Sequence, residues 1–109
     1  MTALDVPEPI ASFITVVNRH DLHGFLASFA QNGVVDDWGR EFTGRDEIRA
    51  WSDKEFIGAL GTLTPEEVGQ DGEEIVVVGD WRSHHANGRS RFAFQVGEHG
   101  IERMTIREG

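Results

Sequence analysis

The sequence predicts an α+β fold, with helices packed on one face of an antiparallel sheet. In the first half of the chain, apolar residues recur at three- and four-residue spacing, which indicates amphipathic helices. The second half holds strand-like runs separated by Asp-Gly and Asn-Gly pairs, which favour turns between strands. This order, helices first and strands afterwards, is typical of the α+β class. The length of 109 residues suits one domain, so we expect a single domain over residues 1–109.

Two helices are expected in the first third of the chain. The first should begin near Asp5, because Asp5 and Glu8 can cap it and Pro7 suits its first turn. Asp21 can cap the second, which residues 32–33 (Asn-Gly) would end. Their apolar stripes are Ile10, Phe13, Ile14 and Val17 in the first helix and Leu22, Phe25, Leu26 and Phe29 in the second.

A short strand and a third helix are expected next. Residues 33–38 form a short run with high strand propensity. Thr43 can then cap a helix whose first turn contains Asp46 and Glu47, and negative charge is favourable near the positive end of a helix. The buried side of this helix should consist of Ile48, Trp51 and Phe56.

The second half of the chain should form the rest of the sheet. Strands are expected over residues 62–68, 75–85, 91–96 and 101–107. Pro65 has no N–H to donate, so the first of these strands should lie at an edge. Asp71-Gly72 and residues 97–100 should form turns between consecutive strands.

Asn87-Gly88 is the strongest turn signal, and a two-residue loop there would set the pairing of its two strands. The paired side chains would share one mostly aromatic face, which the helices should cover. His85, near the end of this face, is either a rim histidine bonded to Ser90 or water, or a pocket group that contacts a ligand. The expected pairs are Trp81 with Phe94, Ser83 with Phe92, and His85 with Ser90.

Asp36 and Asp37 lie in a strand, where aspartate is disfavoured. Alternation of side chains places Val35 and Asp37 on one face. If Val35 packs under the helices, Asp37 points into the interior or a cleft, where burial raises the pKa of a carboxyl and suits it to act as a general base. Alternatively, both acids are solvated or pair with the arginines at positions 40 and 45.

The net charge and the composition of the chain disfavour several classes of binding partner and chemistry. Ten basic and nineteen acidic residues give a net charge of −9, which disfavours binding to nucleic acid and to anionic membranes. The chain has no cysteine, which excludes disulfides and thiolate chemistry. Residues 1–10 lack the features of a signal peptide, so we expect a cytoplasmic protein. His84 and His85 would point to opposite faces of a strand, so we expect no metal site, and no cofactor is implied.

Several segments resemble one known family. The runs FITVVNRHDLHGF (13–25), VVDD (34–37) and FTGRDEIRAW (42–51) resemble the nuclear transport factor 2 superfamily, and its SnoaL-like branch is the most similar. That branch includes polyketide cyclases and Δ5-3-ketosteroid isomerases. The strand half, with RFAF (91–94) and IERM (101–104), is similar too, so the resemblance covers nearly the whole chain.

The resemblance implies a cone-shaped, curved antiparallel sheet around three helices, with an apolar pocket inside and a homodimer formed through the outer sheet face. The general base of the isomerases falls on Asp37. Their oxyanion-hole tyrosine falls on Phe13, which has no donor, and their second donor falls near Ser90. The Asp-Arg-Asp arrangement of related epoxide hydrolases is not evident in the sequence.

Two functions remain open. The first is a module that binds a small apolar molecule, dimerises through its sheet, or does both. The alternative is a cofactor-independent isomerase, cyclase or dehydratase for a small carbonyl compound, with Asp37 as base and His85 and Ser90 bonded to the enolate oxygen. The environment of Asp37 distinguishes them. The expected pocket residues are Phe13, Val35, Trp51, Trp81, Ser83, Phe92 and Phe94.

Overall fold

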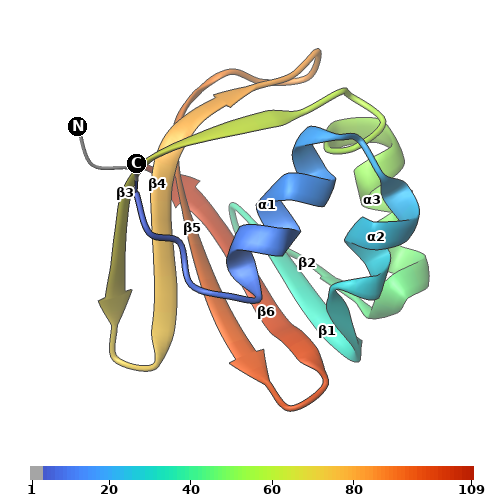
Figure 1. The fold of residues 1–109 in the computed structure, drawn as a ribbon. Coiled ribbons are helices and arrows are strands. Elements are labelled where there is room, and N and C mark those ends of the chain that lie inside the picture. Colours follow the sequence, from blue (N-terminus) through green and yellow to red (C-terminus); the bar gives the residue numbers. More distant parts are fainter. Residues whose placement is uncertain (1–3) are drawn as a thin grey trace.

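The computed structural model describes residues 4–109, which form three helices and a six-stranded sheet that curves around them without closing (Figure 1). Residues 1–3, part of the stretch where no signal peptide is expected, lie outside the described residues. The helices are α1 (Ile10–Asn18), α2 (Leu22–Ala27) and α3 (Gly44–Glu55). The strands are β1 (Phe29–Asp37), β2 (Arg40–Thr43), β3 (Thr62–Asp71), β4 (Glu74–Arg82), β5 (Gly88–Gly97) and β6 (Gly100–Glu108).

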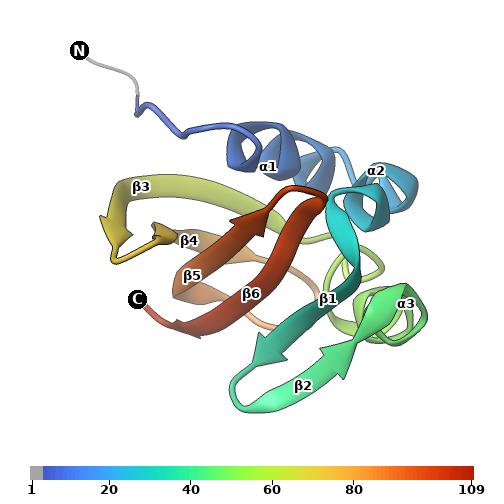
Figure 2. The same cartoon turned by 90° about the horizontal axis from the view of Figure 1, so that it is seen from below.

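The sheet is mixed, which corrects the expectation of a purely antiparallel sheet. Its strand order is β2-β1-β6-β5-β4-β3, and β1 and β6 are parallel while every other pair is antiparallel. After the β1–β2 hairpin, α3 carries the chain to the far edge, and four successive strands then return to β1. Figure 2 shows the arrows of β1 and β6 pointing the same way. This return places the end of β6 beside the end of β1.

The first two helices differ from the expected boundaries. Helix α1 begins at Ile10 instead of Asp5, and the Glu8 carboxylate accepts a hydrogen bond from the Ser12 N–H (2.9 Å). The predicted cap at Asp21 is confirmed, because its Oδ1 accepts from the Gly24 N–H (3.0 Å). Helix α2 ends at Ala27, well before residues 32–33. Phe29 is already paired in β1, so the sheet ends this helix early.

The space between α1 and the sheet is filled by aromatic rings. Phe13 is the centre of this cluster: its ring centroid lies 5.7 Å from that of Phe25, 5.8 Å from that of Phe29 and 5.5 Å from that of Phe94. All four side chains are buried. Edge-on and tilted packing of this kind leaves no room for a ligand at this end of the molecule.

The β4–β5 register differs from the prediction. Trp81 pairs with Gly88, and Phe94 pairs with Ile75, so residues 83–87 form a five-residue loop. In this loop the Asn87 side chain accepts from the Ser83 N–H (3.0 Å) instead of entering a two-residue turn. The shift is an even number of residues, so the side chains that remain in the two strands keep their predicted face, while Ser83 and His85 now lie in the loop. The aromatic face covered by the helices is therefore as predicted.

Strand β1 begins at Phe29 instead of residue 33, and β2 (Arg40–Thr43) was not expected, whereas the other strands lie close to their predicted positions. Strand β3 is an edge strand, as Pro65 suggested, and an irregularity in its pairing with β4 follows that residue. The β3–β4 turn lies directly after Asp71, and the β5–β6 turn lies between Gly97 and Gly100. Within the described part of the chain, no helix is long and apolar enough to span a membrane.

Candidate functional site

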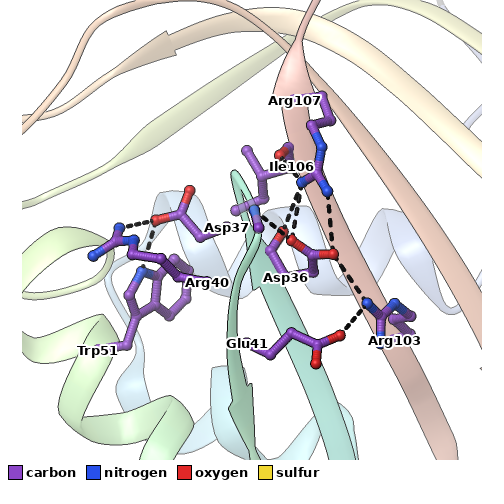
Figure 3. A network of polar contacts seen from close by, with 9 residues as sticks. Asp36, Asp37, Arg40, Glu41, Trp51, Arg103, Ile106 and Arg107 are labelled. Atoms are coloured by element: carbon purple, nitrogen blue, oxygen red, sulfur yellow. Dashed lines mark hydrogen bonds and ion pairs between the residues drawn. The ribbon is translucent and has the colours of Figure 1, made fainter.

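Asp36 and Asp37, at the end of β1, point to opposite sides of the sheet (Figure 3). Both are largely buried, with exposed fractions of 7% and 9%. Asp37 points to the side covered by the helices, as its shared parity with Val35 predicted, and Asp36 points to the outer side. The two carboxylates therefore have separate environments, although they are adjacent in sequence.

Asp36 is fully enclosed by hydrogen-bond donors. Arg107 donates to both of its oxygens (3.0 and 3.1 Å), Arg103 donates to Oδ2 (3.0 Å), and the Gly39 N–H donates to Oδ1 (2.8 Å). The bonds from Arg107, with those from Gly39 and Arg103, hold the pKa of Asp36 below its usual value. This carboxylate joins β1 to β6 and closes the β1–β2 turn, which is a structural role.

Asp37 has one oxygen held and one oxygen open. Its Oδ2 accepts from Trp51 Nε1 (3.1 Å) and forms an ion pair with the Arg40 guanidinium. Its Oδ1 accepts no hydrogen bond from the described residues. Every buried side-chain polar atom in these residues has a partner, so Oδ1, which has none, is accessible to solvent. The carboxylate is thus fixed in orientation while one oxygen stays available to another molecule.

A chain of polar contacts continues from Asp37 across the site. Arg40 also donates to both oxygens of Glu55 (2.6 and 3.0 Å), and His85 Nε2 lies 3.0 Å from Glu55 Oε1. Arg40 lowers the pKa of Glu55, and Glu55, ahead of Asp37, raises the pKa of Arg40. This chain of contacts thus contains two carboxylates, one guanidinium and one imidazole. We call these four residues the polar rim.

The polar rim borders a cavity of about 150 Å³. Its apolar side is a stack of rings: Phe56 lies between Trp81 and Trp51, at centroid distances of 4.5 and 4.8 Å. A cavity of this volume holds a molecule about the size of benzene. The lining residues are Asp37, Trp38, Arg40, Trp51, Glu55, Phe56, Trp81, His85, Ala86, Ser90, Phe92 and Ile106.

The structure brings most of the predicted site residues together at this cavity. They are Asp37, His85, Ser90, Trp51, Trp81 and Phe92. The other predicted pocket residues lie elsewhere: Phe13, Val35 and Phe94 are in the solid core, and Ser83 is in the β4–β5 loop, where its hydroxyl accepts from the N–H groups of His85 and Ala86.

Two features of the site are absent from the sequence prediction. Glu55 was missed, although it lies four residues after Trp51 and therefore on the same face of α3. The carboxylate–guanidinium–carboxylate arrangement was also missed: Asp37, Arg40 and Glu55 form one in space, with glutamate as the second acid. Helical spacing from Trp51 was the signal that could have found Glu55. Within residues 4–109, no three histidine or acidic side chains are grouped so as to hold a metal ion.

Comparisons with known proteins place the chain in a family. The model of the SnoaL-like domain matches residues 10–109, so the chain belongs to the SnoaL-like domain family. No curated protein sequence matches it.

Solved structures share the fold at low sequence identity. A candidate polyketide cyclase from Sinorhizobium meliloti has a TM-score of 0.82 and 20% identity, over 98% of this chain and 100% of that one. The Mycobacterium tuberculosis protein Rv0760c, in complex with estradiol-17β-hemisuccinate, has a TM-score of 0.74 and 22% identity, over 92% and 90%. The epoxide hydrolase/cyclase-like enzyme SalBIII has a TM-score of 0.77 and 21% identity, over 92% and 87%.

Proposed function

We propose that this SnoaL-like domain binds a small, mostly apolar molecule that places one ring in the cavity beside Asp37. The observation that carries the proposal is the pairing of an aromatic stack with a carboxylate oxygen that no described residue bonds. The rings offer apolar contact, and Asp37 Oδ1 offers an acceptor for a hydroxyl or amine. The estradiol-17β-hemisuccinate complex of Rv0760c supports a hydrophobic ligand, and the volume of about 150 Å³ favours a smaller one here.

The charge of the polar rim selects among such ligands. Its two carboxylates, from Asp37 and Glu55, share the one guanidinium of Arg40, so a third carboxylate on a ligand would be repelled, while a neutral hydroxyl would be accepted. We therefore expect phenol to bind with a Kd of about 1 mM, near what seven non-hydrogen atoms can give. Benzoate, which has the same ring, should bind more weakly.

Titration of the ¹⁵N-labelled protein with phenol and benzoate, followed by NMR, tests this proposal. The Trp51 and Trp81 indole signals should shift with phenol. Ser90→Leu fills the cavity and should abolish the shifts, while Gln95→Leu is the matched control because Gln95 is exposed on the same strand. Equal binding of phenol to both variants, or no binding to the unaltered protein, would contradict the proposal.

Acid–base catalysis is a second candidate, favoured by the open oxygen of Asp37. In this reaction, Oδ1 takes a proton from the carbon next to a ketone, and the C–H electron pair moves to the carbonyl oxygen to form an enolate. Ser90 and His85 border the same cavity and are the candidate partners for that oxygen. Return of the proton to the same carbon gives only exchange, whereas in a β,γ-unsaturated ketone its return to the far carbon of the dienolate moves the double bond into conjugation and completes an isomerisation.

Exchange of ketone protons for solvent deuterium tests this candidate. Cyclohexanone in D₂O should lose its α-proton NMR signals faster with the protein than without it, and Asp37→Asn should remove the difference. Asp46→Asn, an exposed acid on α3, is the control. A small epoxide should be tested in parallel, because Asp37, Arg40 and Glu55 form a carboxylate–guanidinium–carboxylate set that differs from the Asp-Arg-Asp arrangement of related epoxide hydrolases by having glutamate as the second acid. No rate above background with either compound would exclude the enzymatic use for these substrate types.

We also propose that two copies pair through the outer face of the sheet. Val76 and Val78 on β4 point to that face, since Val77 between them points to the core, and both are only half-buried. Apolar side chains that are partly exposed on a sheet face favour a partner surface. Sedimentation should show a dimer that Val78→Lys dissociates, and a monomer at all concentrations would contradict this pairing.

A further inference from the structure

Trp38 is placed unusually for a large apolar residue. It is 61% exposed and lies in the two-residue turn between β1 and β2, where it has a φ of 54° and Gly39 has a φ of 90°. Two successive positive φ values favour Asn-Gly in such a hairpin turn, and a bulky residue there is strained. Neither core packing nor turn chemistry explains a tryptophan at this position, so contact with another molecule is the explanation that remains.

Trp38 lies at the boundary between the cavity and a neighbouring surface groove. It lines the cavity beside Asp37, and it also lines a surface groove of about 380 Å³ that lies outside that cavity. Trp81, Ala86 and Ser90 border both spaces as well, so the groove continues from the cavity mouth. The remaining border of the groove is polar and includes Asn87, Arg89 and Glu108. Arg89 is already bonded to Glu66 and Glu67, so its charge is compensated.

We infer that the ligand is longer than the cavity: one ring occupies the cavity, and a second flat apolar group lies in the groove against the Trp38 indole. This inference rests on the proposed function, because it extends the same site. The groove offers the Trp38 indole as an aromatic surface, and the positive charge of Arg89 on its border is already compensated, which suits an uncharged planar group. The ligand class is therefore a two-ring or longer molecule with a hydroxyl or carbonyl at the end that enters the cavity.

A comparison of phenol with 4-phenylphenol tests the inference. The second ring should reach the groove and tighten binding on the order of tenfold, since one aromatic contact of this kind gives about that gain. Trp38→Asn should remove most of this gain, so it should weaken 4-phenylphenol several-fold more than phenol, which meets Trp38 only at the edge of the cavity. Asn suits the turn better than Trp, so this variant should fold at least as stably. The Trp38 indole NMR signal should shift more with 4-phenylphenol than with phenol.

Leu60→Asn is the matched control. Leu60 is also an exposed apolar residue with a positive φ (48% exposed, φ 59°), and it borders neither the cavity nor the groove. This variant should keep the affinities for both probes. The inference would be overturned if 4-phenylphenol bound no more tightly than phenol, or if Trp38→Asn kept the full gain in affinity. In either case, binding of phenol would still support the cavity as a ligand site.

Two further outcomes separate the inference from its alternatives. If neither probe binds, the proposed function fails and the longer ligand fails with it. If Trp38→Asn instead converts a dimer to a monomer in sedimentation, Trp38 belongs to an interface between copies, and the groove is not a ligand site.

Discussion

Asp36 and Asp37 are neighbours with nearly equal burial and arginine partners, yet the structure gives them different tasks (Figure 3). Both oxygens of Asp36 are taken by donors from Arg103, Arg107 and Gly39. Among residues 4–109, Asp37 has donors on one oxygen only. Both acids are buried and paired with arginine, so neither property marks a functional site. The distinguishing feature is an acceptor oxygen without a donor, on a side chain that lines a cavity.

The largest expected difference between the two sides is in stability. Asp36→Asn removes the charge that two part-buried arginines face, and it should lower the free energy of unfolding by roughly 2 kcal/mol, less than a fully buried pair would lose because both arginines are partly exposed. Asp37→Asn should lower it by less than about 1 kcal/mol, because Arg40 keeps Glu55 and Asn can still accept from Trp51. Urea denaturation measures both. Equal losses would remove the distinction drawn above.

The pH dependence of stability should also follow Asp36. Its pKa is lower in the folded state than in the unfolded chain, so its contribution is complete above the unfolded value of about 3.9 and is lost as the pH falls through the folded value. The stability difference between the unaltered protein and Asp36→Asn should therefore be constant at neutral pH and shrink below about pH 4. Urea titrations from pH 7 to pH 2 test this. A difference that grows on acidification would reverse the assigned direction.

The coupling free energy between an acid and its arginine partner should be smaller on the Asp37 side of the strand than on the Asp36 side. A double-mutant cycle of Arg40→Ala with Glu55→Gln should give about 0.5–1 kcal/mol, because half of the Arg40 side chain is exposed and solvent screens the pair. The same cycle for Asp36→Asn with Arg107→Ala should give a larger value. If the Arg40 pair couples more strongly, the polar rim has a structural role as well.

The sequence anticipated this division only in part. Alternation along β1 correctly placed Asp37 on the helix side with Val35. Side chains alternate with a period of two, so a register that is wrong by an even number of residues still puts each side chain on the correct face. For the same reason Trp81 and Phe92 reached the predicted face, although the β4–β5 register was wrong. Local pattern thus fixes which side of a sheet a residue faces.

The local sequence pattern could not predict which part of the interior is filled by side chains and which part is left as a cavity. Phe13, Phe94 and Val35 share the predicted face with the cavity residues, but rings from α2 and β1 pack against them and fill that end. The partners of Asp37 come from a turn and from α3, so their meeting depends on how the helix packs on the sheet. The Asn87 side chain likewise bonds to the loop, a choice that no dipeptide preference predicts.

The smallest expected effect is in ligand affinity, and it bears most directly on the open oxygen. Asp37→Asn exchanges a carboxylate acceptor for an amide and should weaken phenol binding about fivefold, near what one hydrogen bond contributes. Asp36→Asn should leave the affinity unchanged at a temperature where it is folded, since its side chain points to the outer face. NMR titration of both variants gives the two affinities. Equal weakening would mean that the variants act through the fold of β1, and unequal weakening in the stated order would assign the ligand's polar group to the Asp37 side of the strand.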